Sequence, residues 1–317
     1  MTKWRCMLTS LTLVILGVLS ARAQTVVPSS QTPSQDPKDW LRQAFDDAHQ
    51  RGTDPSIEFT DNKIFSDQEL FAEMEELLEV KRCRSLSLSA RSSGDKCGDQ
   101  YDFDKLQNDL VRLRAFLGTQ GYLQANIGGL KMEDSGRGLK VVVSIEAGRR
   151  YRVGQIKVIG AEFFSAEQII QLTGFRPGEI ASAENIRKGI YEEIKRAYGD
   201  QGYIQASADL EPEFKDDPFR PQEGVVNFTI RVDEGKAFSI RSIKFVGLVQ
   251  ADFQMLRDQL LIQEGGVYSK RLMEESLANI NRLGLVEEIW EKNVRTSVYG
   301  QTSQVDIEIH VREKETP

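Results

Sequence analysis

Histidines and clustered carboxylates are the side chains of this sequence that could perform acid–base or metal chemistry. The chain has two histidines, His49 and His310, and the second lies in the alternating segment VDIEIHV, where we expect it to face outward on a strand rather than act as a base. The run DQYDFD offers Asp99, Asp102 and Asp104, but it lacks the glycine and the terminal glutamate of a calcium loop. Asp102 is better explained as a helix cap.

The remaining polar groups do not form a catalytic pattern. The adjacent pairs Glu75-Glu76 and Asp216-Asp217 are expected to point in different directions and to be solvated. Asn227 begins a glycosylation triplet but lies inside a predicted strand, where chance explains it. The sequence shows no glycine-rich phosphate loop before a helix and no serine nucleophile elbow. We therefore predict a protein that is not an enzyme and that uses no metal, no cofactor and no small-molecule substrate.

The first 23 residues resemble an export signal. Lys3 and Arg5 form a positive start, Met7–Leu19 is an apolar run, and Ala21–Ala23 supplies the small residues of a cleavage site. The apolar run is shorter than the roughly 20 residues that span a bilayer. We predict a signal peptide over 1–23, with an uncleaved inner-membrane anchor as the alternative.

Cleavage would leave a strongly acidic chain. It would remove three basic residues and no acidic ones, so that 38 Lys and Arg stand against 48 Asp and Glu, a net charge of −10. Nucleic acids and anionic lipids are bound by excess positive charge, so neither is predicted as the main partner. No later segment of the sequence is apolar enough to cross a membrane as a helix. We therefore predict that the mature chain is a soluble exported protein.

Residues 24–55 are predicted to be a disordered linker. The stretch QTVVPSSQTPSQ, residues 24–35, is rich in Pro, Ser, Thr and Gln and has little apolar surface to bury. Trp40, Leu41 and Phe45 indicate a short amphipathic helix before Gly52, with no partner evident from the sequence.

Two cysteines would remain after cleavage, Cys83 and Cys97, because Cys6 leaves with the signal. In an exported protein an isolated pair is more often a disulfide than a redox or metal site. Closing a loop of about 15 residues would stabilise the fold by about 3 kcal/mol on the chain-entropy estimate. No histidine lies nearby to complete a zinc site. We predict a Cys83–Cys97 disulfide.

The sequence repeats itself. IKVIG at Ile156 and IKFVG at Ile243 are each followed by the same spacing of turn and cap residues. The matching residues are Gly160, Gly178 and Ser182 in the first of these stretches and Gly247, Gly265 and Ser269 in the second. Such matched spacing is typical of a repeated structural unit.

The central copy shows the order of elements. A strand runs from Tyr151 to Gly160, SAEQ forms a capping box before a short helix, and Gly174 ends that helix. Ser182 caps a longer helix, and two strands follow, YIQASADLE and VVNFTIRVDEG. The longer helix carries a stripe of apolar residues four apart: Ile186, Ile190, Ile194 and Tyr198.

Two further copies share this order. The first begins with SIEFTDN and the capping box SDQE, and Gly121-Tyr122 ends its second helix as Gly202-Tyr203 ends that of the central copy. Its helical stripes are Leu70, Met74 and Leu77, then Leu106, Leu110, Leu113 and Leu117. The third copy carries Met273, Leu277 and Ile280 on a second helix that is predicted to be shorter by more than one turn.

The predicted fold is therefore α+β, with three tandem domains over 56–150, 151–236 and 237–314. Each domain is a strand-helix-helix-strand-strand unit in which two amphipathic helices cover one face of a three-stranded mixed sheet. A unit of about 80 to 95 residues of this kind can fold independently.

The recurring pattern resembles the POTRA domains of the BamA-like family of outer-membrane assembly and translocation proteins. It consists of a strand closed by Gly, a capped helix, a G-x-x-[AY]-S turn, a second helix ending in Gly-Tyr, and a closing V-x-V-x-E-G strand. The resemblance implies a periplasmic array that binds unfolded outer-membrane proteins and barrel or assembly-complex subunits. The sequence departs from the family after the last strand, where only REKETP follows and no barrel is predicted.

A sheet edge is the predicted binding site. Unpaired edge strands offer backbone donors and acceptors to any extended chain, and the resemblance implies that the strand after the second helix is the exposed one. We predict this edge in YIQASADLE, followed directly by Pro212. Its residues are Ile204, Gln205, Ala206, Ser207, Ala208, Asp209 and Leu210. Two alternatives stay open: a structural scaffold of a cell-envelope complex, as in a division scaffold, and the severed amino-terminal part of a BamA-like barrel protein.

Overall fold

A computed structural model describes residues 37–85, 100–134, 138–247 and 253–314. The predicted signal peptide and residues 24–36 of the predicted linker lie outside the described residues. The described residues divide into two compact units, and residues 178–184 and 214–226 of the second repeat belong to the same unit as the first repeat.

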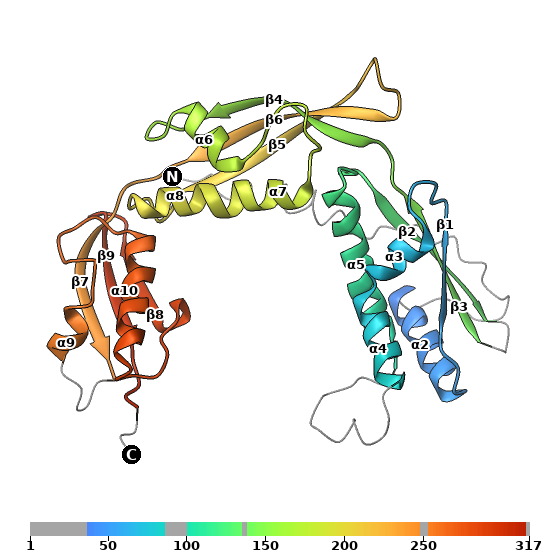
Figure 1. The fold of residues 1–317 in the computed structure, drawn as a ribbon, viewed down its shortest axis with the longest axis horizontal. Helices are drawn as coiled ribbons and strands as arrows, with labels where there is room; N and C mark the ends of the chain where they lie inside the picture. The colour runs from blue at the N-terminus through green and yellow to red at the C-terminus, as the bar shows by residue number, and fades with distance from the viewer. Residues whose placement is uncertain (1–36, 86–99, 135–137, 248–252, 315–317) are drawn as a thin grey trace, which may run out of the picture. The chain divides into compact units, whose positions relative to one another are not determined.

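Three mixed sheets of three strands each follow one another along the chain (Figure 1). In every sheet the first strand lies at one edge, the last strand lies in the centre, and the middle strand forms the other edge. The sheets are β1 (Ser56–Thr60), β3 (Leu139–Glu146) and β2 (Asn126–Asp134); β4 (Arg150–Ile159), β6 (Glu223–Asp233) and β5 (Ser207–Asp216); β7 (Ser239–Val246), β9 (Gln304–His310) and β8 (Val294–Tyr299). The α+β repeat of strand, helices and two strands is confirmed.

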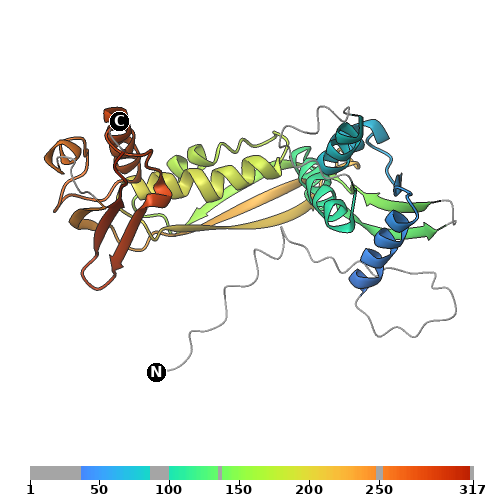
Figure 2. The same ribbon diagram turned by 90° about the horizontal axis from the view of Figure 1, so that it is seen from below.

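The strand directions explain why helices stand between the first and second strands. In the first and third sheets the first strand is parallel to the last, and the middle strand is antiparallel to it. Antiparallel neighbours need only a tight hairpin, whereas a strand that joins its sheet in parallel needs a long crossover, which the helices provide. Figure 2 shows the helices of the second repeat on one face of its sheet.

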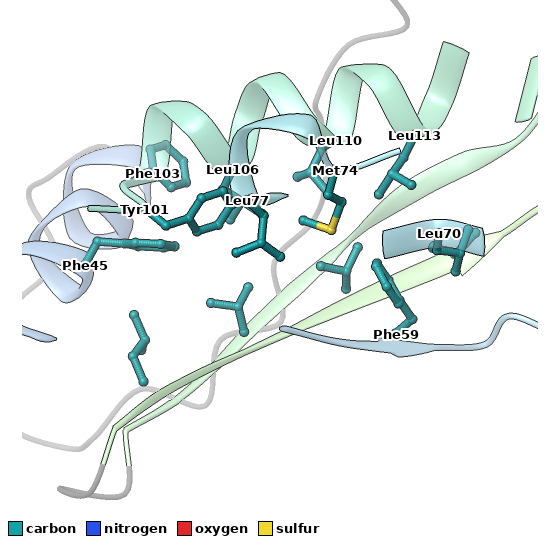
Figure 3. Close-up of a cluster of buried hydrophobic side chains, with 14 of the residues drawn as sticks. Phe45, Phe59, Leu70, Met74, Leu77, Tyr101, Phe103, Leu106, Leu110 and Leu113 are labelled. Atoms are coloured by element: carbon teal, nitrogen blue, oxygen red, sulfur yellow. The ribbon is translucent and has the colours of Figure 1, made fainter. Parts of the chain in front are cut away.

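The described residues contain one helix before the first repeat and three within it, where two were predicted. They are α2 (Pro37–Gln50), α3 (Asp67–Ala72), α4 (Glu75–Ser85) and α5 (Phe103–Thr119). The short amphipathic helix predicted around Trp40 is therefore present, and it packs on the first repeat. Phe45 and Ala48 are fully buried, and the rings of Phe45 and Phe103 lie 6.1 Å apart (Figure 3). Burial of an apolar helix face offsets the entropic cost of ordering this segment.

Local capping follows the sequence closely. Ser66 accepts the backbone N–H of Glu69 while the Glu69 carboxylate accepts the N–H of Ser66 at 2.7 Å, which is the predicted capping box. Asp102 accepts the N–H of Lys105 at 2.8 Å and begins α5, so its role as a cap is confirmed.

A buried carboxylate joins α4 to α5. Asp109 on α5 is fully buried, and its oxygens accept the backbone N–H groups of Glu76 at 2.9 Å and Leu77 at 3.1 Å. The Tyr101 hydroxyl donates to the same carboxylate at 2.8 Å, and Arg112 Nη1 lies 3.4 Å away. Burial, and then the negative charge of Asp109, raise the pKa of Tyr101. Asp109 therefore caps the first turn of a neighbouring helix, whose N–H groups have no partner within that helix.

The long helix of the second repeat widens in its middle. It consists of α7 (Ala183–Arg187), the π-helical segment η1 (Lys188–Glu193) and α8 (Ile194–Asp200), and the N–H of Ile194 donates to the carbonyl oxygen of Gly189. A stripe of residues four apart would drift around an α-helix of 3.6 residues per turn. The wider π turn reduces this drift. All four residues of the predicted stripe are buried as a result: Ile186, Ile190, Ile194 and Tyr198.

The second helix is shortest in the third repeat. The helix α6 (Ala166–Thr173) of the second repeat corresponds to α9 (Phe253–Arg257), and the continuous helix 183–200 corresponds to α10 (Lys270–Leu283) of 14 residues, followed by η2 (Glu291–Asn293). The shortening amounts to about one turn. The predicted core residues Met273, Leu277 and Ile280 lie on α10 and are buried in the core of the third repeat.

The repeated glycines that close the first strand meet the last strand. Gly160 has a φ of +85°, and a Cβ placed there would lie 2.3 Å from the carbonyl oxygen of Val232. Gly247 has a φ of +100°, and its Cβ would lie 2.3 Å from the carbonyl oxygen of Val311. Only glycine satisfies both the left-handed backbone and this close approach. The identical environment in two repeats explains why the sequence repeats these residues.

Candidate functional site

The strand β5 is an edge strand, but it begins later than predicted. It spans Ser207–Asp216, whereas Ile204, Gln205 and Ala206 form a turn in which the N–H of Ala206 donates to the carbonyl oxygen of Tyr203 at 3.0 Å. Ile204 packs against the core of the third repeat. The alternation in Tyr203–Ala206 therefore serves a junction between repeats, and the predicted strand over 203–211 was wrong at both ends.

One face of β5 is buried and the other is exposed. Ala208 and Leu210 are buried, whereas Ser207, Asp209 and Glu211 are exposed, as the alternation predicted. The exposed face is acidic, and two of its carboxylates accept side-chain hydrogen bonds from the central strand β6. Its contacts are Glu211 to Arg231 Nε at 2.6 Å and Glu213 to Asn227 Nδ2 at 3.2 Å. The hydrogen bond from Arg231 lowers the pKa of Glu211.

The backbone of β5 has a defined outward side. The N–H of Asp217 donates to the carbonyl oxygen of Glu223 on β6 at 3.4 Å, and side-chain contacts place Glu213 beside Asn227 in the same register. Since backbone groups alternate along a strand, odd-numbered residues of β5 face β6 and even-numbered residues face away from it. Ala208 and Leu210 therefore offer backbone N–H and C=O groups at the open edge.

Pro212 lies within β5 rather than after it. Its position is even-numbered, so the missing N–H belongs to the outward side and costs the sheet no hydrogen bond. It interrupts the row of outward donors after Leu210. Proline on an edge limits pairing with other chains, which restricts the open stretch of β5 to its first half.

Matching junctions join successive repeats and were not recognised from the sequence. Within the first unit, the N–H of Tyr151 donates to the carbonyl oxygen of Gly121 at 2.9 Å, and the Tyr151 carbonyl oxygen accepts the N–H of Ala181 at 3.0 Å. Within the second unit, Phe238 makes the corresponding two bonds. Its N–H donates to the carbonyl oxygen of Gly202 at 2.9 Å, and its carbonyl oxygen accepts the N–H of Tyr268 at 3.0 Å. The recurring Gly-Tyr and G-x-x-[AY]-S motifs could have indicated these junctions. Each motif supplies one of the two residues that bond to the aromatic residue at the start of the next repeat, Tyr151 or Phe238.

The glycines of these junctions admit no side chain. A Cβ on Gly121 would lie 2.7 Å from Ile180 Cγ2, and one on Gly202 would lie 2.7 Å from Val267 Cγ1. In the first junction Arg152 also donates two hydrogen bonds. Its Nε donates to the carboxylate of Glu223 at 2.6 Å, and its Nη1 donates to the carbonyl oxygen of Gly178 at 3.0 Å. Hydrogen bonds from Arg152 and then from Arg220 lower the pKa of Glu223 to about 2.

Groups that could do chemistry are dispersed. Within the described ranges no group of three His, Cys, Asp or Glu side chains could hold a metal ion. His310 is one of the residues that line a pocket of about 270 Å³, together with Glu287, Glu288, Ile289, Asn293, Val311 and Arg312. The Nε2 atom of His310 lies 3.9 Å from the carboxylate of Glu308. This lining offers no hydroxyl or thiol nucleophile for the imidazole to activate.

Cys83 is 2% exposed at the end of α4 and is disulfide-bonded. Its predicted partner, Cys97, lies outside the described residues, as does Asp99. The Cys83–Cys97 pairing therefore stays a prediction. Non-reducing digestion followed by mass spectrometry should recover the two peptides linked, and reduction should separate them. Free thiols at both positions in protein prepared from the periplasm would contradict the pairing.

Comparison with known proteins identifies the repeats. The family described as "POTRA: Surface antigen variable number repeat" matches residues 56–148, 151–235 and 238–314. Among the described residues no helix is long and apolar enough to span a bilayer.

Two BamA relatives are considerably longer than the region that matches this chain. The outer membrane protein assembly factor BamA of Buchnera aphidicola subsp. Acyrthosiphon pisum (strain APS) is 22% identical over 218 residues, which cover 68% of this chain and 34% of that protein. BamA of Neorickettsia risticii (strain Illinois) is 23% identical over 262 residues, which cover 82% and 33%. The chain thus spans about a third of the length of these relatives.

A solved structure supports the fold. The crystal structure of Haemophilus influenzae BamA POTRA3-5 superimposes with a TM-score of 0.58 at 20% identity and covers 82% of this chain and 96% of that one. Its three successive domains correspond in number to the three sheets of Figure 1. The chain therefore belongs to the POTRA family and contains three tandem copies of its domain.

Proposed function

We propose that this chain is a periplasmic POTRA array that supports outer-membrane protein assembly by binding unfolded outer-membrane polypeptides and subunits of the assembly machinery. The names of the BamA relatives support the process, and the open half of β5 supports the mode of binding. Ala208 and Leu210 present backbone groups that any extended chain can pair with, whatever its sequence. Backbone pairing suits polypeptides that share alternation but no motif.

The observation that carries this proposal is the direction of the β5 backbone. Proline at Ala208 would remove an outward N–H and leave the bonds to β6 intact, whereas proline at Asp209 would remove an N–H that the sheet uses. Ala206 and Ser207 are unsuitable for this comparison, because the N–H of Ala206 donates within a turn and the N–H of Ser207 faces β6.

Ala208→Pro is expected to keep the thermal stability of the unaltered chain and to weaken binding of an unfolded barrel-strand peptide about tenfold or more, since a hydrogen bond is lost and a ring obstructs the edge. Fluorescence anisotropy with a labelled peptide measures the affinity.

Asp209→Pro is the matched control and should destabilise the second repeat, as seen by hydrogen exchange of β5 and β6. Unchanged peptide affinity in a folded Ala208→Pro chain would refute binding at this edge and would direct attention to the helical face.

A further inference from the structure

The edge strand of the third sheet, β8, is exposed on both of its faces. Every residue from Arg295 to Tyr299 is exposed, and Val294 is partly buried. The corresponding strand β5 has one buried face. Val298 is 42% exposed although its neighbour on β9, Val305, is fully buried.

Features that limit edge pairing are present in the two other repeats and are missing from β8. The edge strand β2 has a register shift between Gly128 and Lys131, and β5 contains Pro212. Bulges and prolines are the usual means by which proteins protect an edge. By contrast, β8 pairs with β9 without interruption over six residues, from Val294 opposite Ile309 to Tyr299 opposite Gln304.

The outward backbone groups of β8 follow from hydrogen bonds at the two ends of β9. The carbonyl oxygen of Ser303 accepts the N–H of Ser239, and the N–H of Val311 donates to the carbonyl oxygen of Val246. Odd-numbered residues of β9 therefore face β7, and the even-numbered ones face β8. Their partners on β8 are the odd-numbered residues. Val294, Thr296 and Val298 are left with backbone groups that point away from the sheet.

We propose that β8 pairs with β8 of a second copy of this chain in antiparallel orientation, around a two-fold axis at Thr296. The two three-stranded sheets would then form one sheet of six strands. In this register the three outward residues of each strand hydrogen-bond those of the other, with Thr296 opposite itself and Val294 opposite Val298. A two-fold interface uses the same patch on both copies, so the patch must complement itself.

The side chains of β8 meet this requirement. On the side of the helices, Val294 and Val298 would form two apolar cross-strand pairs, which stabilise sheets. On the other side, Arg295 would face Ser297 of the second copy, so like charges are not opposite each other. Arg295 also keeps Glu308 as its neighbour within its own sheet.

Self-complementarity favours a second copy over a foreign strand. β8 carries a single charge, on Arg295, and in the proposed register this charge faces Ser297 rather than a second Arg295, so two copies of the strand meet without like-charge repulsion. One six-residue pairing is small beside the area of a stable interface, so a weak, concentration-dependent dimer is expected. The inference stands apart from the proposed function, because it concerns a different edge and a different partner.

Charge substitutions at the axis test the dimer. Thr296→Glu and Thr296→Lys would each place like charges opposite each other, and each variant alone is expected to remain monomeric. An equal mixture of the two variants is expected to recover the dimer, because Glu then lies opposite Lys. Sedimentation velocity of the purified chain from about 1 to about 500 μM covers the range in which so small an interface should associate.

The same substitutions at Ser207, an exposed residue of the β5 edge, are the matched control and should leave the dimer intact. Hydrogen exchange of β9 verifies that each variant keeps its fold. An unaltered chain that stays monomeric over the whole range would overturn the proposal. Dimers that persist in both single variants would overturn it as well, and protection of β8 only by an added strand peptide would assign the edge to a foreign polypeptide.

Discussion

Replacing Asp109 by alanine is expected to destabilise the first repeat by about 3–5 kcal/mol, because three donors lose the acceptor that they share. The substitution leaves the N–H groups of Glu76 and Leu77 and the Tyr101 hydroxyl without their acceptor. Buried donors cannot turn to water, so each loss carries its own desolvation cost of about 1–3 kcal/mol. The first turn of α4 should open as a result.

Two further variants separate the effect of losing these hydrogen bonds from the effect of losing side-chain volume. Asp109→Asn keeps the size of the side chain, and its remaining oxygen can still accept from Leu77 and Tyr101, so it should lose only the bond from Glu76 and cost less than alanine. Tyr101→Phe removes a single donor and should cost about 1 kcal/mol.

Hydrogen exchange measured by mass spectrometry is the appropriate readout, because the chain has several domains and one global unfolding transition is not expected. The amides of Glu76 and Leu77 should lose their protection in Asp109→Ala. Asp102→Ala is the matched control, since it removes an ordinary helix cap and should cost about 1 kcal/mol. Equal effects of Asp109→Ala and Asp102→Ala would show that the buried carboxylate has no special role.

Gly247→Ala should destabilise the third repeat by about 2–5 kcal/mol, and Gly160→Ala should do the same in the second repeat. The left-handed backbone alone costs a residue with a Cβ about 1–2 kcal/mol. The new methyl group would also lie 2.3 Å from a backbone carbonyl oxygen, of Val311 or of Val232. Relieving that overlap requires the first and last strands to separate, and such overpacking costs about 1–3 kcal/mol more.

Each repeat contains its own control. Gly265 has a φ of +83° and Gly178 a φ of +88°, but a Cβ at either position would meet nothing within 4 Å. Alanine at these positions should cost only the backbone strain, about 1–2 kcal/mol. Exchange of the β7 and β9 amides, or of the β4 and β6 amides in the second repeat, measures the difference. The clash argument fails if Gly265→Ala is as damaging as Gly247→Ala.

Elements that depend on local periodicity were predictable. The capping box at Ser66, the cap at Asp102 and the left-handed end of α6 at Gly174 all depend on residues within one or two turns of each other. The shorter second helix of the third repeat followed from the distance between its cap and its terminal glycine. The three-fold recurrence of the pattern was sufficient for the fold, because the same strand and helix signals occurred in the same order each time.

Elements that depend on distant partners were not predictable. Tyr203–Ala206 alternates like a strand, yet Ile204 is drawn into the core of the next repeat, which moves the start of β5 to Ser207. The helix α2 was visible from its amphipathic pattern, but its place beside Phe103 depends on a surface built from residues far along the chain. In the sequence Asp109 resembles a charged residue at the side of an apolar helical stripe. It becomes a buried cap only because α4 packs against α5 and donates two backbone N–H groups to its carboxylate.

The candidate binding edges separate the two kinds of information most clearly. Pro212 favoured an edge position for β5, since proline is poorly suited to the centre of a sheet, and the resemblance to POTRA domains implied the same strand. The direction of each backbone N–H was decided only by the hydrogen bonds of the folded sheet, because a shift of one residue reverses which groups point outward. The exposure of both faces of β8 likewise depends on what the rest of the repeat packs against the strand, which no property of VRTSVY itself determines.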